Sequence, residues 1–313
     1  MPAPASEHTV GHMPQQFASM AHNQPSLQPL FTAFGQVQEA VAHCRALLPP
    51  PDAAALAPDP ALLEQGVPLL EQPSVSIPLG AQLDQAALVI LPAVAAGFPA
   101  LDKACATFGA ALRHDGFAAR CHAMLQDNGA DGPAALAAEL GVDADALIFL
   151  LQCLVRPELE ACAAAAAPAL EQTPWTVWNR GLCPVCGGAP AMSILQLGPQ
   201  EPTEYLKNVS AQRWLCCASC AHTWRISRTL CPSCGQDTHE AREYFNVEGN
   251  PQERVELCRH CNHYLLTVDM RDRMTPVDHR LAPLGLVHLD MLAQQRGYQP
   301  QAVFPWTMPP RQG

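Results

Sequence analysis

The stretch Cys183-Pro184-Val185-Cys186-Gly187 returns later in the chain as Cys231-Pro232-Ser233-Cys234-Gly235. Each copy is followed by a plainer Cys-x-x-Cys pair, which is Cys217/Cys220 after the first copy and Cys258/Cys261 after the second. A Cys-x-x-Cys turn, called a knuckle below, can direct both of its sulfur atoms at one metal ion. The repeated order of the knuckles therefore predicts a tandem duplication of a metal-binding unit.

The eight paired cysteines suffice for two closed sites of four sulfur ligands each. The gaps between successive pairs are 30, 10 and 23 residues, and the two longer gaps leave room for a hairpin between knuckles. This favours sequential pairing, with interleaved pairing as the alternative. Cys216 adjoins Cys217 but lacks the knuckle spacing to Cys220, so we assign it as a neighbour of the site. The predicted ligands are Cys183, Cys186, Cys217 and Cys220 at the first site, and Cys231, Cys234, Cys258 and Cys261 at the second.

The chemistry predicted for these sites is metal binding without catalysis. Four thiolates suit zinc or iron, and mononuclear iron in such a cage could pass one electron. Four protein ligands leave no open position for a catalytic water. The sequence also lacks the GxGxxG, Walker A, G-x-S-x-G and HExxH motifs, so it predicts that the protein is not an enzyme. Redox-active dithiols of the thioredoxin type would need a βαβ context, which is missing around the pairs.

The remaining cysteines, histidines and tryptophans are interpreted as structural. Five cysteines lie singly on apolar helical segments and are predicted to be small core residues, namely Cys44, Cys105, Cys121, Cys153 and Cys162. The histidines His222, His260 and His263 flank knuckles but are not needed as ligands. Four tryptophans near the knuckles are predicted to supply core for small metal-bound units, namely Trp175, Trp178, Trp214 and Trp224.

Composition and charge argue against several classes of protein. The formal net charge is -11; residues 1–179 carry 5 basic and 17 acidic side chains, and residues 180–313 carry 13 and 12. A nucleic-acid-binding protein needs a basic surface, which this balance disfavours. No run of 18 apolar residues and no signal-peptide pattern is present, so we expect no membrane insertion and a cytoplasmic location. Cysteines in that compartment stay reduced and suit metal binding better than disulfides.

The N-terminal half predicts helices. Residues 1–30 are polar and read as a disordered tail, and residues 31–173 as a helical domain in which Thr32 caps the first helix. Apolar spacing and glycine stops then predict helices over 81–96, 98–113, 115–128, 133–140 and 144–172. Pro157 is expected to kink or split the last of these.

The C-terminal half predicts strands and one closing helix. Alternating residues predict a strand over 223–228, a hairpin of 244–248 with 254–258, and a strand over 264–269. A helix near 283–296 should present Leu284, Val287, Met291 and Leu292 on one face. The fold class is thus α+β. An all-helical domain precedes tandem rubredoxin-like or zinc-ribbon subdomains, with the first four-cysteine ribbon at 174–229 and the second, plus the C-terminal helix, at 230–313.

The flanks of the knuckles carry a family resemblance. Trp178-Asn179-Arg180-Gly181-Leu182 precedes the first knuckle, Arg213-Trp214-Leu215 the second, and Tyr244-Phe245-Asn246-Val247-Glu248-Gly249 the last. Together with the order and spacing of the cysteines, these segments resemble the formate dehydrogenase accessory proteins of the FdhE family over residues 174–300. The region 32–172 is similar to that family only in its Ala- and Leu-rich helical character.

The resemblance implies an assembly factor that is needed for active respiratory formate dehydrogenase. It implies binding to the catalytic subunit of that enzyme before twin-arginine export, and iron at the eight paired cysteines. Two alternatives stay open on the residues alone. One is a rubredoxin-type electron carrier, which would not need the large helical domain. The other is a zinc-ribbon nucleic-acid-binding protein, which the charge balance disfavours.

Overall fold

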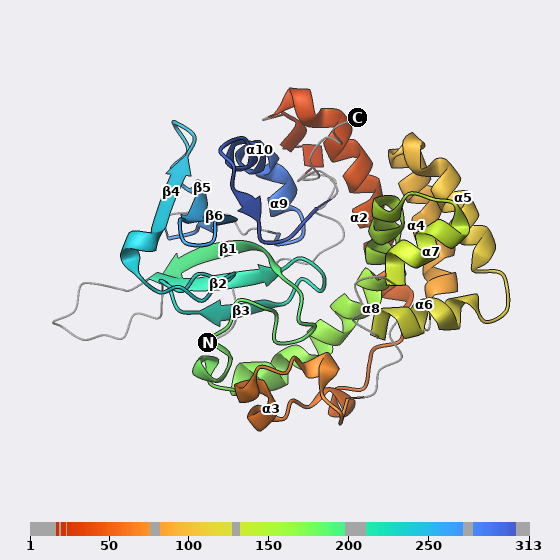
Figure 1. Ribbon diagram of the computed structural model, residues 1–313, viewed down its shortest axis with the longest axis horizontal. Coiled ribbons are helices and arrows are strands. Elements are labelled where there is room, and N and C mark those ends of the chain that lie inside the picture. The colour runs from red at the N-terminus through yellow and green to blue at the C-terminus, as the bar shows by residue number, and fades with distance from the viewer. Residues whose placement is uncertain are drawn as a thin grey trace. The chain divides into compact units, whose positions relative to one another are not determined.

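The chain folds into two compact units, which are described separately (Figure 1). The computed structural model describes residues 17–18, 20–22, 24–75, 82–126, 132–197, 211–271 and 278–304. The helical unit consists of the described residues of 17–52 and 82–165, and the sheet unit of 53–75 and 166–304. Helix α8 (Ala144–Gln172) contributes residues to both units. Within the described ranges, no helix is long and apolar enough to cross a bilayer.

The helical unit begins earlier in the chain than predicted. A short 3-10 turn, η2 (Pro25–Leu27), leads into α2 (Gln28–Leu47), so part of the predicted tail is helical. Each element has a proline in its first turn, where the fixed φ of proline suits the helix and its missing N–H would be unpaired anyway. Thr32 is therefore not an N-cap. Its hydroxyl donates to the Gln28 carbonyl oxygen from within the helix, at 3.0 Å.

The predicted helices are confirmed to within a few residues. They are α4 (Leu83–Gly97), α5 (Asp102–Ala111), α6 (Phe117–Gln126), α7 (Gly132–Leu140) and α8. The first part of the predicted 98–113 helix is a 3-10 turn, η5 (Pro99–Leu101). Helix α8 runs without interruption through Pro157, so the predicted split is wrong. A proline removes one helical hydrogen bond, and the other turns of this 29-residue helix remain in place.

The core of the helical unit is built on aromatic contacts. Phe34, Phe98 and Phe149 pack edge to face, with ring centroids 4.8 to 6.3 Å apart. Gly97 at the end of α4 lies so close to α2 that an added Cβ would come 2.9 Å from the Ala33 carbonyl oxygen. The five single cysteines are buried, which confirms their prediction as core residues.

The sheet unit contains one seven-stranded sheet. The first repeat supplies β1 (Pro190–Leu197), β2 (Ala211–Cys217) and β3 (Thr223–Ile226), and the second supplies β4 (Arg242–Asn246), β5 (Glu253–Cys258) and β6 (His263–Asp269). The strand order is β3-β2-β1-β6-β5-β4, and the short β7 (Gln299–Pro300) also pairs with β6. The predicted strands thus became β3 to β6, whereas β1 and β2 were not predicted.

The two repeats join head to tail within this sheet. Each repeat places its strands in the same order, and the last strand of the second repeat, β6, pairs in parallel with the first strand of the first repeat, β1. The Ser193 and Thr267 hydroxyls meet across this junction at 2.7 Å. The tandem ribbons predicted from the sequence are present, but they share one sheet.

The two faces of the sheet differ in composition. One face is apolar and packs Met192, Ile194, Val255 and Leu266 with residues of the C-terminal helices. The other face carries the buried polar groups, namely Arg213, Glu256 and the Ser193–Thr267 pair, together with the buried leucines Leu195, Leu215 and Leu265. Alternation of side chains along each strand produces this division.

The predicted closing helix is interrupted. It forms α9 (Ala282–Gly285) and α10 (Val287–Gln295), with Leu286 between them outside the helical region at φ -96° and ψ 10°. The interruption shifts the helical phase, so Leu289 is fully buried while Met291 is 49% exposed. The prediction that Met291 shares one face with Leu284 and Val287 was therefore wrong, because those two side chains are buried.

This pair of residues gives a test of the packing. We expect Leu289→Ala to lower the free energy of unfolding by about 2–5 kcal/mol, because it leaves a cavity in the core of the sheet unit. Met291→Ala on the same helix should change it by less than about 0.5 kcal/mol. Chemical denaturation of both variants measures the difference. Equal losses would mean that α10 does not pack as described.

Candidate metal centres

The two opening knuckles share one backbone turn, and each closing knuckle shows part of it. The Cys183 N–H donates to the Gly188 carbonyl oxygen at 2.9 Å, and the Gly187 N–H returns to the Cys183 carbonyl oxygen at 3.0 Å. The first of these hydrogen bonds recurs from the Cys217 N–H to the His222 carbonyl oxygen and from the Cys231 N–H to the Gln236 carbonyl oxygen. The second recurs from the Gly235 N–H to the Cys231 carbonyl oxygen and from the Asn262 N–H to the Cys258 carbonyl oxygen. The repeated spacing in the sequence therefore reflects a repeated local structure.

The residue after each knuckle has a left-handed backbone. The φ angles are 71° at Gly187 and 72° at Gly235 after the opening knuckles, and 57° at Ala221 and 56° at Asn262 after the closing ones. Glycine adopts this region without steric cost, and asparagine tolerates it better than most residues. The turn brings the chain back so that both sulfur atoms of a knuckle point the same way.

The eight predicted ligands come together in two groups of four, in the sequential arrangement. Within each group the sulfur atoms all lie within 4.8 Å of one another. The Cys183–Cys220 and Cys186–Cys217 sulfur distances are 3.6 and 3.5 Å. In the second group both cross-knuckle distances, Cys231–Cys261 and Cys234–Cys258, are 3.8 Å.

These distances suit a tetrahedral metal ion. Metal–sulfur bonds of about 2.3 Å at tetrahedral angles place the sulfur atoms about 3.8 Å apart. A disulfide would require about 2.05 Å, far shorter than any of the four distances. Both groups could therefore hold a metal ion. No histidine or carboxylate of the described residues joins either group.

The first cluster is held by residues 53–75, which lie within the range predicted as the helical domain. This segment contains η3 (Ala54–Leu56), α3 (Pro60–Gln65) and η4 (Leu69–Glu71). The N–H groups of Leu69 and Leu70 donate to the carbonyl oxygens of Pro184 and Val185, inside the first knuckle, at 2.8 and 2.9 Å. These bonds explain why residues 53–75 group with the sheet unit.

Two glycines mark close approaches around the clusters. A Cβ added at Gly188 would lie 3.2 and 3.3 Å from the sulfur atoms of Cys217 and Cys186. A Cβ at Gly181 would lie 1.8 Å from the Pro232 carbonyl oxygen, in the opening knuckle of the second repeat. The backbone before the first cluster therefore touches the second repeat directly.

The polar surroundings favour thiolates at particular cysteines. Hydrogen bonds from the thiols of Cys183, Cys186 and Cys220 hold the pKa of Cys217 well below its usual value. At Cys258 burial opposes ionisation, but the backbone N–H groups of Cys261 and His260 lower the pKa overall. Backbone donors of this kind stabilise the charge of a metal-bound thiolate as well.

The two clusters differ in exposure. Three of the four cysteines of the first cluster are buried and Cys186 is half-buried. In the second cluster Cys234 is exposed and Cys261 is half-buried. Cys216 is fully buried in the apolar core beside Met192, apart from the first cluster.

The tryptophans do more than fill the core. Trp178, Trp214 and Trp224 are buried, whereas Trp175 is 37% exposed and lies beneath the Arg225 guanidinium at 4.4 Å. All four line a cavity of about 350 Å³ next to the first cluster, together with Pro184 and His222. The predicted core role is confirmed for Trp178, Trp214 and Trp224 and is wrong for Trp175, and the cavity was not predicted.

Comparisons with known proteins agree with the resemblance drawn from the motifs. No family model matches the chain. Protein FdhE homolog of Aquifex aeolicus is 29% identical over 161 residues, which are 51% of this chain and 52% of that protein. Protein FdhE homolog of Pectobacterium atrosepticum is 28% identical over 134 residues, which are 42% and 39% of the two chains.

The fold is also similar to a solved structure. The crystal structure of the FdhE protein from Pseudomonas aeruginosa superimposes with a TM-score of 0.62 and 20% identity, and the match covers 96% of both chains. The sequence matches span about half of the Aquifex relative and less of the Pectobacterium one, whereas the fold matches throughout. The resemblance to the FdhE family and the α+β fold class are thereby confirmed.

Loss of one predicted ligand tests the first cluster. We expect Cys183→Ser to reduce bound metal from two ions to one per chain and to destabilise the sheet unit by several kcal/mol, because metal binding contributes directly to folding. Elemental analysis and thermal melting measure both effects. Cys216→Ala is the matched control and should keep both ions, at a cost of about 1 kcal/mol for the small cavity. If the Cys183→Ser variant still bound two metal ions, Cys183 would not be a ligand of the first cluster.

The close approach at Gly188 gives an independent test. We expect Gly188→Ala to weaken metal retention at the first cluster, because the added methyl group presses on two ligand sulfur atoms. Gln236→Ala alters the equivalent position of the second repeat, where a Cβ is already present, and should leave both metals bound. Competition with a chelator compares the two variants. Equal retention would mean that the first knuckle is looser than the structure indicates.

Proposed function

We propose that this chain, which is similar in sequence and fold to the FdhE proteins, is an accessory factor for the assembly of respiratory formate dehydrogenase. The observation that carries the proposal is the pair of closed four-cysteine clusters, framed by FdhE-like motifs and set in one sheet. Each cluster would use all of its ligands from the protein, which leaves no open position for substrate. The protein would then act by binding a client, without catalysis, in the cytoplasm.

Two iron ions are the proposed metals, with zinc as the alternative. The eight ligands would be the cysteines of the two clusters, whose soft sulfur donors and spacing suit either ion. Iron held by four thiolates would supply one-electron chemistry. Zinc would supply stability alone.

The proposed client is the catalytic subunit of formate dehydrogenase. This partner follows from the family resemblance, and the helical unit supports it, because a simple metal carrier needs no additional domain of this size. An assembly factor would bind the subunit before its twin-arginine export. The acidic net charge of -11 gives no support to a nucleic-acid partner.

A rubredoxin-type electron carrier is the second candidate. The exposed side chain of Cys234 favours it, because electron exchange requires a metal site close to the surface. The two proposals predict different partners, so one experiment that identifies bound proteins separates them.

Anaerobic affinity capture of the tagged full chain from formate-respiring cells tests the proposal. We expect the catalytic subunit of formate dehydrogenase among the strongly enriched proteins identified by mass spectrometry, and its loss with Cys183→Ser or Cys231→Ser. Cys216→Ala is the control and should retain it. Enrichment of electron-transfer proteins in place of the subunit would favour the electron carrier. If neither the subunit nor electron-transfer proteins were enriched, both proposals would be contradicted.

A further inference from the structure

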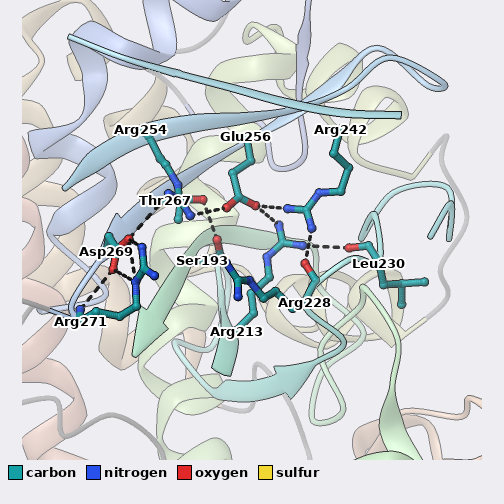
Figure 2. Close-up of polar contacts among 10 residues, drawn as sticks. All are labelled: Ser193, Arg213, Arg228, Leu230, Arg242, Arg254, Glu256, Thr267, Asp269 and Arg271. Atoms are coloured by element: carbon teal, nitrogen blue, oxygen red, sulfur yellow. Dashed lines mark hydrogen bonds and ion pairs between the residues drawn. The ribbon is translucent and has the colours of Figure 1, made fainter. Parts of the chain in front are cut away.

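The polar face of the sheet contains a buried ion network centred on Glu256 of β5 (Figure 2). Its carboxylate pairs with three guanidinium groups, those of Arg213 at 2.8 Å, Arg242 at 2.5 Å and Arg254 at 3.2 Å. Arg213 and Glu256 are 2% and 8% exposed. Charges at such depth are costly unless they are balanced by charges of opposite sign.

Among the ion pairs of the described residues, the positive charges of this network outnumber the negative ones. Asp269 adds a second carboxylate, which pairs with Arg254 at 3.7 Å and with Arg271 at 2.5 Å. Four guanidinium groups therefore share two carboxylates in the network of Figure 2. Arg271 is 36% exposed and solvent can screen it, whereas Arg213 is almost completely enclosed. The excess of positive charge thus lies around Arg213 and Arg242.

These two arginines lie beside the second cysteine cluster. Arg213 donates from Nη1 to the Leu230 carbonyl oxygen at 2.9 Å, directly before Cys231. Arg242 of β4 is the cross-strand partner of Cys258. Both arginines line one small cavity together with Cys231 and Cys258, whereas Arg254 does not line it. Burial lowers the pKa of Arg213, and so do the neighbouring guanidinium groups of Arg242 and Arg254. The Glu256 carboxylate and the Cys231 sulfur atom act in the opposite direction.

A metal ion in the second cluster would supply the missing negative charge. Four thiolates around a divalent ion carry a formal charge of about -2, and around a trivalent ion about -1. Two fixed guanidinium groups nearby stabilise the more negative of these states. At the first cluster a carboxylate approaches the opening knuckle, because a Cβ at Gly187 would lie 3.0 Å from Glu71 Oε1.

We propose that Arg213 and Arg242 are positioning residues for the second metal centre, where they balance its charge and favour the divalent state of its metal. This inference rests on the proposal that the clusters bind metal. Arg213 belongs to β2 of the first repeat, so each repeat contributes to the second centre. The two centres would then differ in function, with the second holding an electron more readily than the first.

The experiment compares Arg242→Gln with Arg254→Gln in the full chain. Both variants remove a guanidinium group from Glu256, but only Arg242 lines the cavity shared with Cys231 and Cys258. In the iron-loaded protein we expect Arg242→Gln to shift the redox equilibrium of one centre about tenfold toward the trivalent state, which is 59 mV for one electron. Arg254→Gln should shift neither centre, and Arg242→Lys should restore the wild-type value.

A second measurement uses zinc, which has no redox chemistry. In competition with a chelator, we expect Arg242→Gln to lower the affinity of one of the two sites for zinc about tenfold. Arg254→Gln should leave the affinity of both sites unchanged. The affected centre should be the one that Cys231→Ser removes. Equal effects of the two glutamine variants, or an effect on the other centre, would overturn the inference. Failure of the wild-type chain to bind two metal ions would instead overturn the metal proposal, and melting curves separate both results from simple loss of stability.

Discussion

The meeting of four sulfur atoms at the end of each repeat is the constraint on which the sheet unit depends. A three-stranded unit of this size buries too little apolar surface to be stable alone. The knuckles bring together chain segments that are separated by 30 and 23 residues, and the shared turn geometry aligns their sulfur atoms at 3.5 to 3.8 Å. Because the knuckles hold the ends of the strands between them, these strands lie next to one another and pair.

Head-to-tail joining of the repeats determines the rest of the unit. Because β6 pairs in parallel with β1, the two ribbons form one sheet with continuous faces. The apolar face is covered by α9 and α10, which neither repeat could bury alone. The opposite face becomes the place where a guanidinium group of the first repeat meets a carboxylate of the second. The two similar repeats thus form one structure with two unequal sites.

This inequality bears on the proposed role. The first cluster is deeply buried and is held by residues 53–75, so it suits a structural centre. The second cluster reaches the surface at Cys234 and has arginines beside it, so it suits a centre that responds to its surroundings. An assembly factor with one centre of each kind could report redox conditions while keeping its client-binding structure intact.

The sequence by itself determined the local features of this protein. The spacing of the cysteines indicated two groups of four, and the pattern of apolar residues located the helices of the N-terminal half to within a few residues. These features depend on residues that are close in the chain, so the periodicity of apolar residues and the spacing of motifs are sufficient to predict them. Strands β1 and β2 were not predicted, although they contain short apolar runs, because strands buried on both faces lack alternation.

Only the tertiary structure decided the features that depend on distant residues. The assignment of residues 53–75 to the sheet unit rests on hydrogen bonds to the first knuckle, more than 100 residues later in the chain. The interruption at Leu286 separated Met291 from the buried face of Leu284 and Val287. The pairing of Arg213 with Glu256 joins strands of different repeats, and no local pattern marks either residue as buried. Motif spacing specifies which residues bind together, whereas the charge around them depends on how the sheet brings the repeats into contact.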